Sequence, residues 1–459
     1  MKDVGLTWIP ISRPFPLPDP VREVILKIHN AGHVAYVVGG SVRDYILQKK
    51  TKDHDIATSA HPDTICELFP NSITVGKAYG VVKIPVKSSQ PGDPDYVEVT
   101  TFREESGYAD YRRPSKVVYS TPEIDVLRRD FTINGLYYDL KTHRILDMVG
   151  GIKDLQLKLI RCIGKPEKRF QEDALRLLRA IRFAVRFDFE IDAQTSATMH
   201  QTGHLVKKIS AERIQDELTL ILTGPAPNKG FEYLLKYGLL PYTLPELERL
   251  KGLAESPLDS RNQDVWAHTL EVLGTLARLY PIRTFTLAWA GLLHEIGKPN
   301  AFEKTGSKNF NNHENESATI VEAIAKRLKF SNRDMVQIKS LVIDLPKFRD
   351  VFQMRESTIQ RWIREPHFEE LLWLEKAVSV SSDGNLAPYD FCYDRYIEMT
   401  KRESSGPVSL VDGNDLIQLG MSPSPLFSRI IRRVEDEVFE GRIKTKEEAL
   451  EFVLQHFVK

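Results

Sequence analysis

Cysteine is scarce in this chain: Cys66, Cys162 and Cys392 are the only three among 459 residues. They are far apart and odd in number, which argues against a disulfide framework and against a cysteine-rich zinc site. Net charge is also lacking, because 63 basic residues balance 63 acidic ones. Any binding of nucleic acid must therefore depend on local patches of positive charge.

Long hydrophobic runs are missing as well. No stretch approaches the roughly 20 apolar residues that a helix needs to cross a bilayer. The opening segment, MKDVGLTWIPISRPFPLPDP, lacks the basic start and apolar run of a secretory signal. The few cysteines fit a reducing compartment. We therefore expect a cytoplasmic protein without a membrane partner.

The order of the sequence patterns predicts an α+β head with a small mixed sheet, followed by an all-α neck, body and tail. Near the start, apolar runs such as VAYVVGG and DYVEVTTF alternate with amphipathic segments such as VREVILKIHNAG. After about Glu167 helical periodicity dominates, and FQEDALRLLRAIRFAVRF is predicted to be one long helix. We divide the chain into a head (1–165), a helical neck (166–235), a helical domain (236–375) and a helical tail (376–459).

Two aspartates stand one residue apart in the segment KDHDIAT. On an extended strand, residues i and i+2 point the same way, so Asp53 and Asp55 project both carboxylates from one face. Hard oxygen ligands of this kind suit Mg²⁺, and two such ions activate an attacking hydroxyl and neutralise a triphosphate. The strand YVEVTT can bring Glu98 alongside as a third carboxylate. An isolated Asp-x-Asp pair is more often a surface feature, so its neighbours decide its meaning.

A glycine pair and an arginine lie one helix upstream, in VVGGSVRD. Gly39 and Gly40 have no side chains, so backbone N–H groups there can approach a phosphate at the start of the following helix. Arg43 adds a forked phosphate donor. This context favours a phosphate site next to the aspartate pair.

The segment RRDFTIN offers further groups that suit a ribonucleotide. Arg129 can bind a phosphate, and Asp130 and Asn134 can form hydrogen bonds with ribose hydroxyls. The alternative is an Arg–Asp pair that braces a turn.

Four charged residues recur at steps of three along EDALRLLRAIRFAVRF: Asp173, Arg176, Arg179 and Arg182. This spacing predicts a polar stripe that winds slowly around a helix. A run of arginines on a helix is usually a solvated or ion-paired face, so the spacing alone does not assign a function.

Together these segments resemble the branch of the nucleotidyltransferase superfamily that contains bacterial tRNA CCA-adding enzymes and poly(A) polymerases. The resemblance covers roughly residues 30–225 and includes ISAERIQDELTLIL, which is similar to the helix that braces the neck. It implies template-independent transfer from CTP and ATP to the 3′ end of tRNA, bound at its acceptor stem, with two Mg²⁺ ions at the aspartate pair. It also implies that Asp173 and Arg176 select the base by its Watson–Crick edge, while Arg179 and Arg182 contact phosphates.

The members of this branch differ in their product. Poly(A) polymerases tend to carry a basic run where this chain has VGKAYGVVKI, which is closer to the tRNA-acting members. CC-adding relatives lack much of the segment at residues 100–119, TTFREESGYADYRRPSKVVY, which resembles the mobile loop of the others. We therefore expect a CCA-adding or A-adding enzyme, with poly(A) polymerase as the alternative. Charges and glycine in the loop are typical of a mobile segment.

The second half resembles the metal phosphohydrolase domain of the HD type. The segments DVWAHTLEVL, LLHEIGKP and NNHENESA supply a possible ligand set: His268, His294, Glu295 and His313. Glu295 stands where the family has Asp, and Asp344 lies near an expected histidine, so we expect a degenerate, metal-poor site. A helical packing domain with stray histidines is one alternative. A phosphohydrolase whose head only senses nucleotides is the alternative of a different class.

The tail contains DGNDLIQLGM, which predicts a helix capped by Asp or Asn and ended by glycine. The runs RIIRR and GRIKTK supply local positive charge suitable for RNA phosphates, although most such runs are solvated helix faces. No pattern indicates a protein partner.

Overall fold

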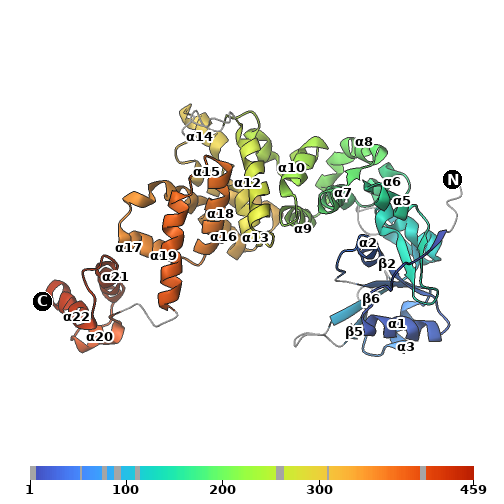
Figure 1. The fold of residues 1–459 in the computed structure, drawn as a ribbon, viewed down its shortest axis with the longest axis horizontal. Helices are drawn as coiled ribbons and strands as arrows, with labels where there is room; N and C mark the ends of the chain where they lie inside the picture. Colours follow the sequence, from blue (N-terminus) through green and yellow to red (C-terminus); the bar gives the residue numbers. More distant parts are fainter. Residues whose placement is uncertain are drawn as a thin grey trace. The chain divides into compact units, whose positions relative to one another are not determined.

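The computed structural model describes residues 7–51, 54–74, 80–86, 95–108, 114–254, 263–307, 310–403 and 410–458. The chain divides into two compact units, Met1–Pro245 and Glu246–Lys459. All the named strands of the described residues belong to the first unit, and the second is built from helices (Figure 1). The predicted α+β head and helical remainder are therefore confirmed, while the finer division into four domains stays a prediction.

A mixed sheet of eight strands forms the centre of the first unit. Its order is β1-β10-β9-β2-β3-β6-β5-β4, and only the β3–β6 pair is parallel. The strands are β1 (Thr7–Pro10), β2 (Ala35–Val38), β3 (Asp55–Thr58), β4 (Ile73–Thr74), β5 (Val81–Val86), β6 (Asp95–Thr101), β9 (Leu136–Asp139) and β10 (Arg144–Asp147). Strands β5 and β6 pair antiparallel over six residues each.

The helices of the first unit fall into two groups. The head contains α1 (Asp19–Asn30), α2 (Gly40–Ile46), α3 (Pro62–Leu68), α4 (Pro122–Asp125) and α5 (Gly151–Gln156). The neck contains α6 (Pro166–Glu172), α7 (Leu175–Phe187), α8 (Ala193–Thr202), α9 (Ala211–Leu222), α10 (Pro227–Lys236) and α11 (Leu240–Thr243), with a short parallel pair, β11 (Leu159–Ile160) and β12 (Glu190–Ile191). Helices α1 and α3 lie side by side against the sheet (Figure 1), and α7 packs on α9 and α10.

The segment predicted as one long helix is two helices, α6 and α7. Asp173 between them has extended backbone angles, φ −143° and ψ 103°. Its Oδ1 accepts a hydrogen bond of 3.1 Å from the backbone N–H of Leu175. Aspartate side chains compete with helical pairing in this way, so the prediction of one continuous stripe is wrong at its first member. Asp173 lies outside α7, and the stripe begins at Arg176.

Two further strands, β7 (Arg103–Tyr108) and β8 (Pro114–Tyr119), pair as an antiparallel hairpin. They occupy the segment predicted to be a mobile loop, whose residues 109–113 lie outside the described residues. Regular pairing is possible because Glu105 is neutralised within the hairpin: it accepts hydrogen bonds from Arg103 Nε and from the Tyr108 hydroxyl, both at 2.6 Å. The mobility of the segment stays a prediction.

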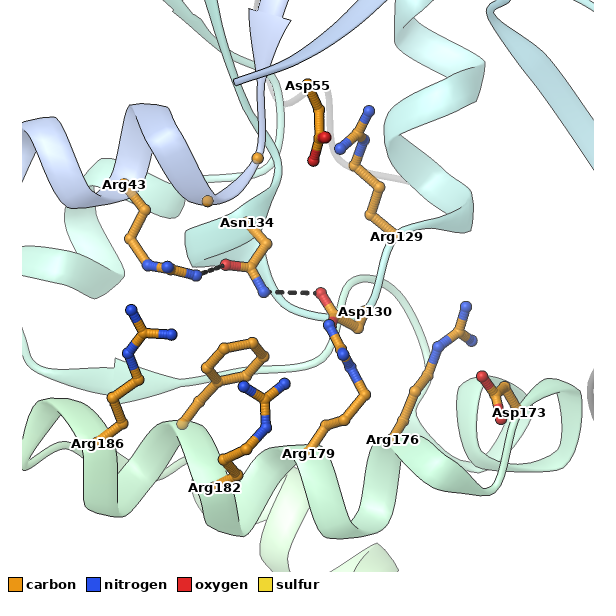
Figure 2. A pocket seen from close by; sticks show the side chains of 13 residues that line it. Arg43, Asp55, Arg129, Asp130, Asn134, Asp173, Arg176, Arg179, Arg182 and Arg186 are labelled. Carbon is orange, nitrogen blue, oxygen red and sulfur yellow. Dashed lines mark hydrogen bonds and ion pairs between the residues drawn. The ribbon is translucent and has the colours of Figure 1, made fainter. Parts of the chain in front are cut away.

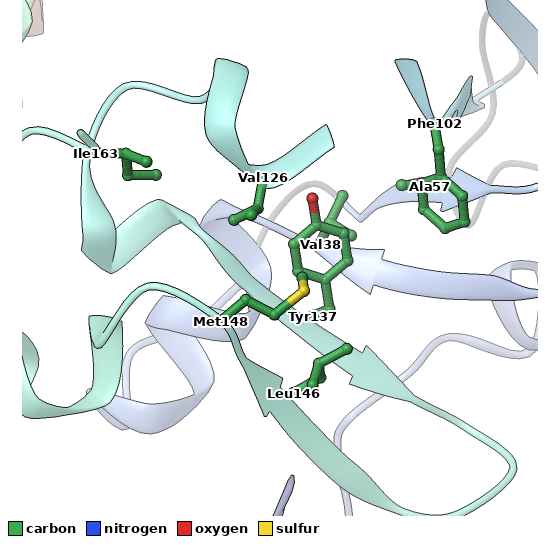
Figure 3. Close-up of a cluster of buried hydrophobic side chains, with 8 residues drawn as sticks. All are labelled: Val38, Ala57, Phe102, Val126, Tyr137, Leu146, Met148 and Ile163. Atoms are coloured by element: carbon green, nitrogen blue, oxygen red, sulfur yellow. The ribbon is translucent and has the colours of Figure 1, made fainter. Parts of the chain in front are cut away.

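A buried hydrophobic cluster fixes the strand ends that carry the predicted motifs. It unites Val38 on β2 and Ala57 on β3 with side chains from β9, β10 and the loops around them (Figure 3). Its members are Val38, Ala57, Phe102, Val126, Tyr137, Leu146, Met148 and Ile163, each at most 7% exposed. Gly39 follows Val38 directly, and Asp55 precedes Ala57 by two residues. The cluster therefore holds both motifs in one place.

The second unit contains eleven named helices among the described residues. They are α12 (Val265–Leu279), α13 (Phe285–Leu293), α14 (Lys298–Thr305), α15 (His313–Leu328), α16 (Asn332–Asp344), α17 (Glu356–Trp362), α18 (Phe368–Ser381), α19 (Ala387–Glu403), α20 (Gly413–Gln418), α21 (Leu426–Phe439) and α22 (Lys446–Phe457). Segments of 3-10 helix across the chain are η2 (Val126–Arg128), η3 (Thr132–Asn134), η4 (Gly203–Lys208), η5 (Pro245–Leu250) and η6 (Leu345–Gln353). Wherever the chain is described, its helices are too short or too polar to cross a bilayer.

The predicted capped helix of the tail is confirmed as α20. Asp412 forms a capping box with Asp415 at its start, and Gly420 beyond its end has a positive φ of 83°. Helices α20, α21 and α22 share one apolar cluster, whose fully buried members include Leu416, Ile430 and Val453.

Candidate active site

A cavity of about 420 Å³ in the first unit gathers most of the predicted site residues (Figure 2). Its lining consists of Gly39, Gly40, Arg43, Asp55, Arg129, Asp130, Asn134, Asp173, Arg176, Arg179, Arg182, Phe183 and Arg186. Segments far apart in the sequence thus meet here: the end of β2, the start of β3, the RRDFTIN segment and helix α7. Of the predicted set, Asp53 lies outside the described residues, and Glu98 does not line the cavity.

The glycine turn and Asp55 are neighbours because β2 pairs with β3. Val38 is the register partner of Asp55, so the turn at Gly39 stands beside the carboxylate. Gly39 has φ +73°, a conformation that L side chains rarely adopt. A Cβ there would also lie 3.4 Å from Arg129 Nη1. Asp55 itself is exposed at the first position of its strand.

Glu98 lies on β6, which runs parallel to β3. Ile56 pairs with Val99, so Asp55 and Glu98 each precede one member of that pair and their side chains leave the sheet on the same face. Glu98 is half-exposed and stands 3.9 Å from Lys83 Nζ on β5. Its role as a third carboxylate stays a prediction.

Arg43 is almost fully buried, and its guanidinium is already well satisfied. It contacts Asp44 Oδ1 at 2.7 and 2.8 Å, donates to Asn134 Oδ1 at 2.5 Å and lies over the ring of Phe187. Burial is the main reason why the pKa of Arg43 lies below its usual value, although Asp44 opposes that shift. Arg43 therefore shapes the cavity wall at least as much as it offers a phosphate donor.

Asp130 and Asn134 form a fixed pair at the centre of the cavity (Figure 2). Asn134 Nδ2 donates to Asp130 Oδ1 at 2.9 Å. Arg179 donates two hydrogen bonds to Asp130 Oδ2, from Nε at 2.9 Å and from Nη2 at 2.7 Å. Burial alone would raise the pKa of Asp130, but Arg179 and these hydrogen bonds lower it to about 2. Asp130 is thus an anion bound by the neck helix, and it is not paired with Arg129 in a simple turn.

Arg129 belongs to a buried network that the sequence did not reveal. Its Nη2 lies 3.2 Å from Asp125 Oδ2 and its Nε donates to the Tyr137 hydroxyl at 3.1 Å. The Tyr137 hydroxyl in turn donates to Asp125 at 2.7 Å. Burial opposes the charge of Arg129, but Tyr137 and Asp125 raise its pKa overall. The network keeps this guanidinium charged and pointing into the cavity.

Asp173 and Arg176 both line the cavity, but each is braced by a different residue. Asp173 Oδ2 accepts a hydrogen bond of 2.9 Å from Arg213 on α9. Arg176 Nη1 lies 3.2 Å from Glu172 Oε2, and its Nη2 donates to the backbone oxygen of Arg128 at 2.7 Å. Neither side chain uses all its hydrogen-bonding positions in these contacts, so both retain capacity towards a ligand.

The remaining arginines of α7 face the same cavity. Arg182 Nε donates to Glu217 Oε2 at 2.6 Å, and Arg186 Nη2 lies 3.6 Å from Asp44 Oδ2. Arg186 was not predicted, although it extends the stripe by four residues from Arg182. In all, six arginines and three carboxylates line the cavity. Carboxylates behind the lining also pair with these arginines: Asp44, Asp125, Glu172 and Glu217. The cavity therefore offers a phosphate several guanidinium donors rather than a large net charge.

The HD-like residues form a separate cluster in the second unit. His268 Nε2 and His294 Nε2 lie 4.0 and 3.9 Å from Glu295 Oε1. His313 is not part of this group, but with His294 and Glu295 it lines a neighbouring cavity of about 450 Å³. Asp344 contacts residues outside this cluster: His367 Nε2 at 2.9 Å and Lys347 Nζ at 2.6 Å.

Three family models match successive parts of the chain: "Poly A polymerase head domain" at residues 35–161, "Probable RNA and SrmB- binding site of polymerase A" at 188–251, and "HD domain" at 265–378. The CCA-adding enzyme of Lactobacillus helveticus is 32% identical over 445 residues, which are 96% of this chain and 98% of that protein. The CCA-adding enzyme of Limosilactobacillus reuteri is 44% identical over 236 residues, 51% of this chain and 56% of that protein. The crystal structure of the Bacillus stearothermophilus CCA-adding enzyme in complex with CTP superposes with a TM-score of 0.70 at 25% identity, covering 96% of this chain and 98% of that one.

Proposed function

This chain belongs to the family of CCA-adding enzymes, and we propose that it adds CCA to the 3′ end of tRNA from CTP and ATP without a nucleic-acid template. The observation that carries this proposal is the composition of one cavity. A glycine turn, an exposed carboxylate, a fixed Asp–Asn pair and a row of arginines line the same space. These are the groups that a nucleoside triphosphate requires for its phosphates, its ribose and the transfer reaction.

The donor set beside the glycine turn fits divalent metal ions. Asp55 offers hard carboxylate oxygens from an exposed position at the cavity. We assign Asp53 and Asp55 as the residues that hold two Mg²⁺ ions, with Glu98 as a third carboxylate on the adjoining strand. Such ions supply Lewis-acid activation of the attacking 3′-hydroxyl and neutralise charge on the phosphates.

The arginines of the cavity bind and orient the triphosphate. The charge of Arg129 is maintained by Asp125 and Tyr137, so it can contact a phosphate without changing its protonation state. Arg182 and Arg186 add charge along α7. Orientation of the α-phosphate towards the RNA 3′-hydroxyl, with pyrophosphate as the leaving group, is the main contribution that positioned residues make to such a transfer.

The ribose is expected to contact Asp130 and Asn134. Arg179 and Arg43 hold these two side chains from opposite ends, which fixes their remaining acceptor and donor positions. A preorganised pair of this kind discriminates in favour of a substrate that carries hydroxyls, because its own polar groups stay unsatisfied when a hydroxyl is missing.

Base selection is assigned to Asp173 and Arg176. A carboxylate acceptor and a guanidinium donor together can satisfy the Watson–Crick edge of cytosine or adenine, as the family resemblance implies. Arg213 and Glu172 brace the two side chains, and this bracing supports a fixed spacing between donor and acceptor. The protein side chains would then replace a nucleic-acid template.

The proposal is tested with tRNA transcripts that end before the first C, after one C and after CC, each incubated with CTP, ATP or both. We expect CTP to extend the first two substrates as far as CC and no further. ATP should add one residue to the CC end only. Long tails from ATP alone would instead identify a poly(A) polymerase, and failure to use CTP on any end would identify an A-adding enzyme.

A phosphohydrolase with a nucleotide-sensing head is the alternative from a different class. The His268–His294–Glu295 cluster favours only weak hydrolysis, since Glu295 is the one carboxylate in the cluster among the described residues. Phosphatase activity in the presence of Ni²⁺ or Mn²⁺ should therefore be low. Strong activity that disappears in His294→Ala would contradict this assignment.

The cytoplasm is the proposed place of action. Cys66, Cys162 and Cys392 are all free thiols, which suits a reducing compartment. Expressing the tagged full chain in its own cells and fractionating them would test this location.

A further inference from the structure

A lysine contacts the carboxylate of the HD-like cluster, the group that would be offered to a metal ion. Lys298 Nζ lies 2.5 Å from Glu295 Oε1, and the Lys298 side chain is only 4% exposed. The same Glu295 oxygen is the one that the His268 and His294 Nε2 atoms face at 4.0 and 3.9 Å. A ligated zinc or similar ion would lie about 2.0–2.2 Å from that oxygen. The Lys298 ammonium therefore occupies the position next to Glu295 Oε1 that a bound ion would need.

One of the two histidines, His294, is oriented as metal ligands usually are. His294 Nδ1 lies 3.0 Å from the backbone oxygen of Gly291, which can only accept, so Nδ1 carries the proton and Nε2 presents its lone pair to the cluster. Within the described part of the chain, His294 Nε2 and Glu295 Oε2 are buried without a hydrogen-bond partner. A donor set for a metal ion is thus present, but Oε1, the carboxylate oxygen that faces both histidines, is paired with Lys298.

The charges of the cluster balance without an ion. Glu295 carries one negative charge and Lys298 one positive charge, and the two charged groups lie 2.5 Å apart. In the described residues no other carboxylate joins the group. A divalent ion would therefore bring two further positive charges into a buried site whose only carboxylate is already neutralised, which low-dielectric surroundings penalise strongly.

We propose that Lys298 is a built-in cation that takes the place of the metal ion in the HD-like domain, and that the buried cluster binds a divalent ion only when this ammonium is removed. The domain then keeps its helices and its histidines for structure, and Lys298 replaces the stabilisation that an ion gives to Glu295. This inference is independent of the transfer reaction in the first unit.

The test measures binding of Co²⁺ and Mn²⁺ to the full-length chain carrying Asp55→Ala, so that the predicted metal site of the head does not contribute. In this background we compare Lys298 with Lys298→Met, which removes the charge, and Lys298→Gln, which keeps a hydrogen-bond donor towards Glu295. We expect no bound ion in the Lys298 protein. The Met variant should bind Co²⁺ about 10- to 100-fold more tightly, the range that changes around a ligating side chain produce. Visible Co²⁺ bands should report histidine ligation and vanish with His294→Ala.

Thermal unfolding gives a second readout that does not depend on activity. Lys298→Met leaves Glu295 buried and unpaired, so the Met variant should unfold at a lower temperature and regain stability when Mn²⁺ is added. The Lys298 protein should not respond. Lys304→Met, which removes an exposed lysine of the same helix, is the matched control and should behave like the Lys298 protein.

Two results would overturn the proposal. One is stoichiometric metal binding by the Lys298 protein that disappears with His294→Ala, and this measurement decides the question even if neither Lys298 variant folds. The other is a folded Met or Gln variant that gains no affinity for Co²⁺. In chains with Asp55 intact, normal CTP incorporation by Lys298→Met shows that the first unit is unaffected.

Discussion

The two units each gather charged side chains from several helices, but they use those charges in opposite ways. In the head cavity Asp55 is exposed, and six arginines outnumber the three carboxylates of the lining. In the HD-like cluster His268, His294 and Glu295 are at most 5% exposed, and Lys298 neutralises the single carboxylate. The first arrangement presents many charged side chains to one cavity, whereas the second buries a single ion pair.

From this difference we predict that the two motifs do not support the same kind of ligand binding. Asp53-x-Asp55 and His294-Glu295 are equally short signals in the sequence. The two motifs differ in their surroundings. Asp55 lines a cavity, whereas Glu295 is buried and paired with Lys298. A residue with a perturbed pKa marks a functional site only when a ligand can also reach that residue.

The largest expected effect comes from removing the carboxylate of Asp55, which lines the cavity of the first unit. Asp55→Ala should lower CTP incorporation by about a thousandfold or more, because metal-assisted charge stabilisation is worth several kcal/mol. Asp53→Ala should behave alike. Single-turnover incorporation measures the effect, and circular dichroism checks the fold. The parallel change in the other unit, Glu295→Gln, should leave incorporation within about twofold. Near-normal turnover in both aspartate variants would show that the chemistry lies elsewhere.

A smaller effect is expected on stability when the buried anion Asp130 is removed. Its pKa is about 2 in the folded chain and about 3.9 when unfolded. Because the folded pKa is the lower one, the carboxylate stabilises the fold above pH 4, and this contribution is lost as the pH falls towards 2. At pH 7 it amounts to about 2 kcal/mol.

Asp130→Asn should therefore lower the free energy of unfolding of the full chain by about 2 kcal/mol at pH 7, and by roughly half of that at pH 3. Urea titrations at the two pH values measure both differences. Asp188→Asn, in an exposed aspartate, is the control and should change little. A deficit that is equal at both pH values would mean that the ion pair with Arg179 is not its source.

Base selection should be sensitive to Asp173 and, less strongly, to the residue that braces it. Losing one hydrogen-bonding partner of a base edge costs about 1–3 kcal/mol, so Asp173→Ala should raise misincorporation of UTP and GTP by about tenfold or more. Arg213→Ala keeps the Asp173 carboxylate but removes the hydrogen bond that orients it. This variant should therefore raise misincorporation by a smaller factor. Arg186→Ala should raise KM for all nucleotides without changing their ranking. Unchanged misincorporation in Asp173→Ala would place base selection at other residues.

Much of the fold could be predicted because it depends on local patterns. Short apolar runs predicted β2, β3 and β6, and Gly39 and Asp55 meet at one cavity because they sit at strand ends fixed by the core. The break at Asp173 could not be predicted from periodicity, since one hydrogen bond from its own side chain decides it. The pairing of β7 with β8 was obscured by charged residues, of which Arg103 and Glu105 pair with each other within β7.

Long-range partners were the other features that the sequence could not provide. Asp125 lies only four residues before Arg129, but nothing in the pattern indicates that Tyr137 also holds Arg129. Arg213 meets Asp173 across 40 residues. Lys298 is a different case. Its spacing of three from Glu295 is a visible ion-pair signal, but both residues lie at the junction of α13 and α14, where helix periodicity gave no reason to pair them.

The smallest expected effect concerns the hairpin of β7 and β8, which we predict to gate the addition of the terminal A. Glu105 on β7 lies 3.6 Å from Arg128 Nη1, and the backbone oxygen of Arg128 accepts a hydrogen bond from Arg176 Nη2 at 2.7 Å. The hairpin is thus two contacts away from the guanidinium assigned to the base. A single rigid pocket cannot fit cytosine and the larger adenine equally well, so we expect a movable element outside the predicted metal site to adjust it.

Glu105→Gln should weaken this connection and lower ATP incorporation onto a CC end by about two- to fivefold, the range of a partly exposed ion pair, with little change for CTP. Replacing residues 104–110 with a Gly/Ser linker removes the connection altogether, so it should enlarge the loss for ATP and still spare CTP, since the linker does not touch Asp55. Glu104→Gln is the matched control, because Glu104 is exposed on the same strand. Parallel time courses with CTP on a C end and ATP on a CC end measure the ratio. A fall that is equal for both nucleotides, or absent for both, would mean that the hairpin supports the fold of the head without distinguishing the two bases.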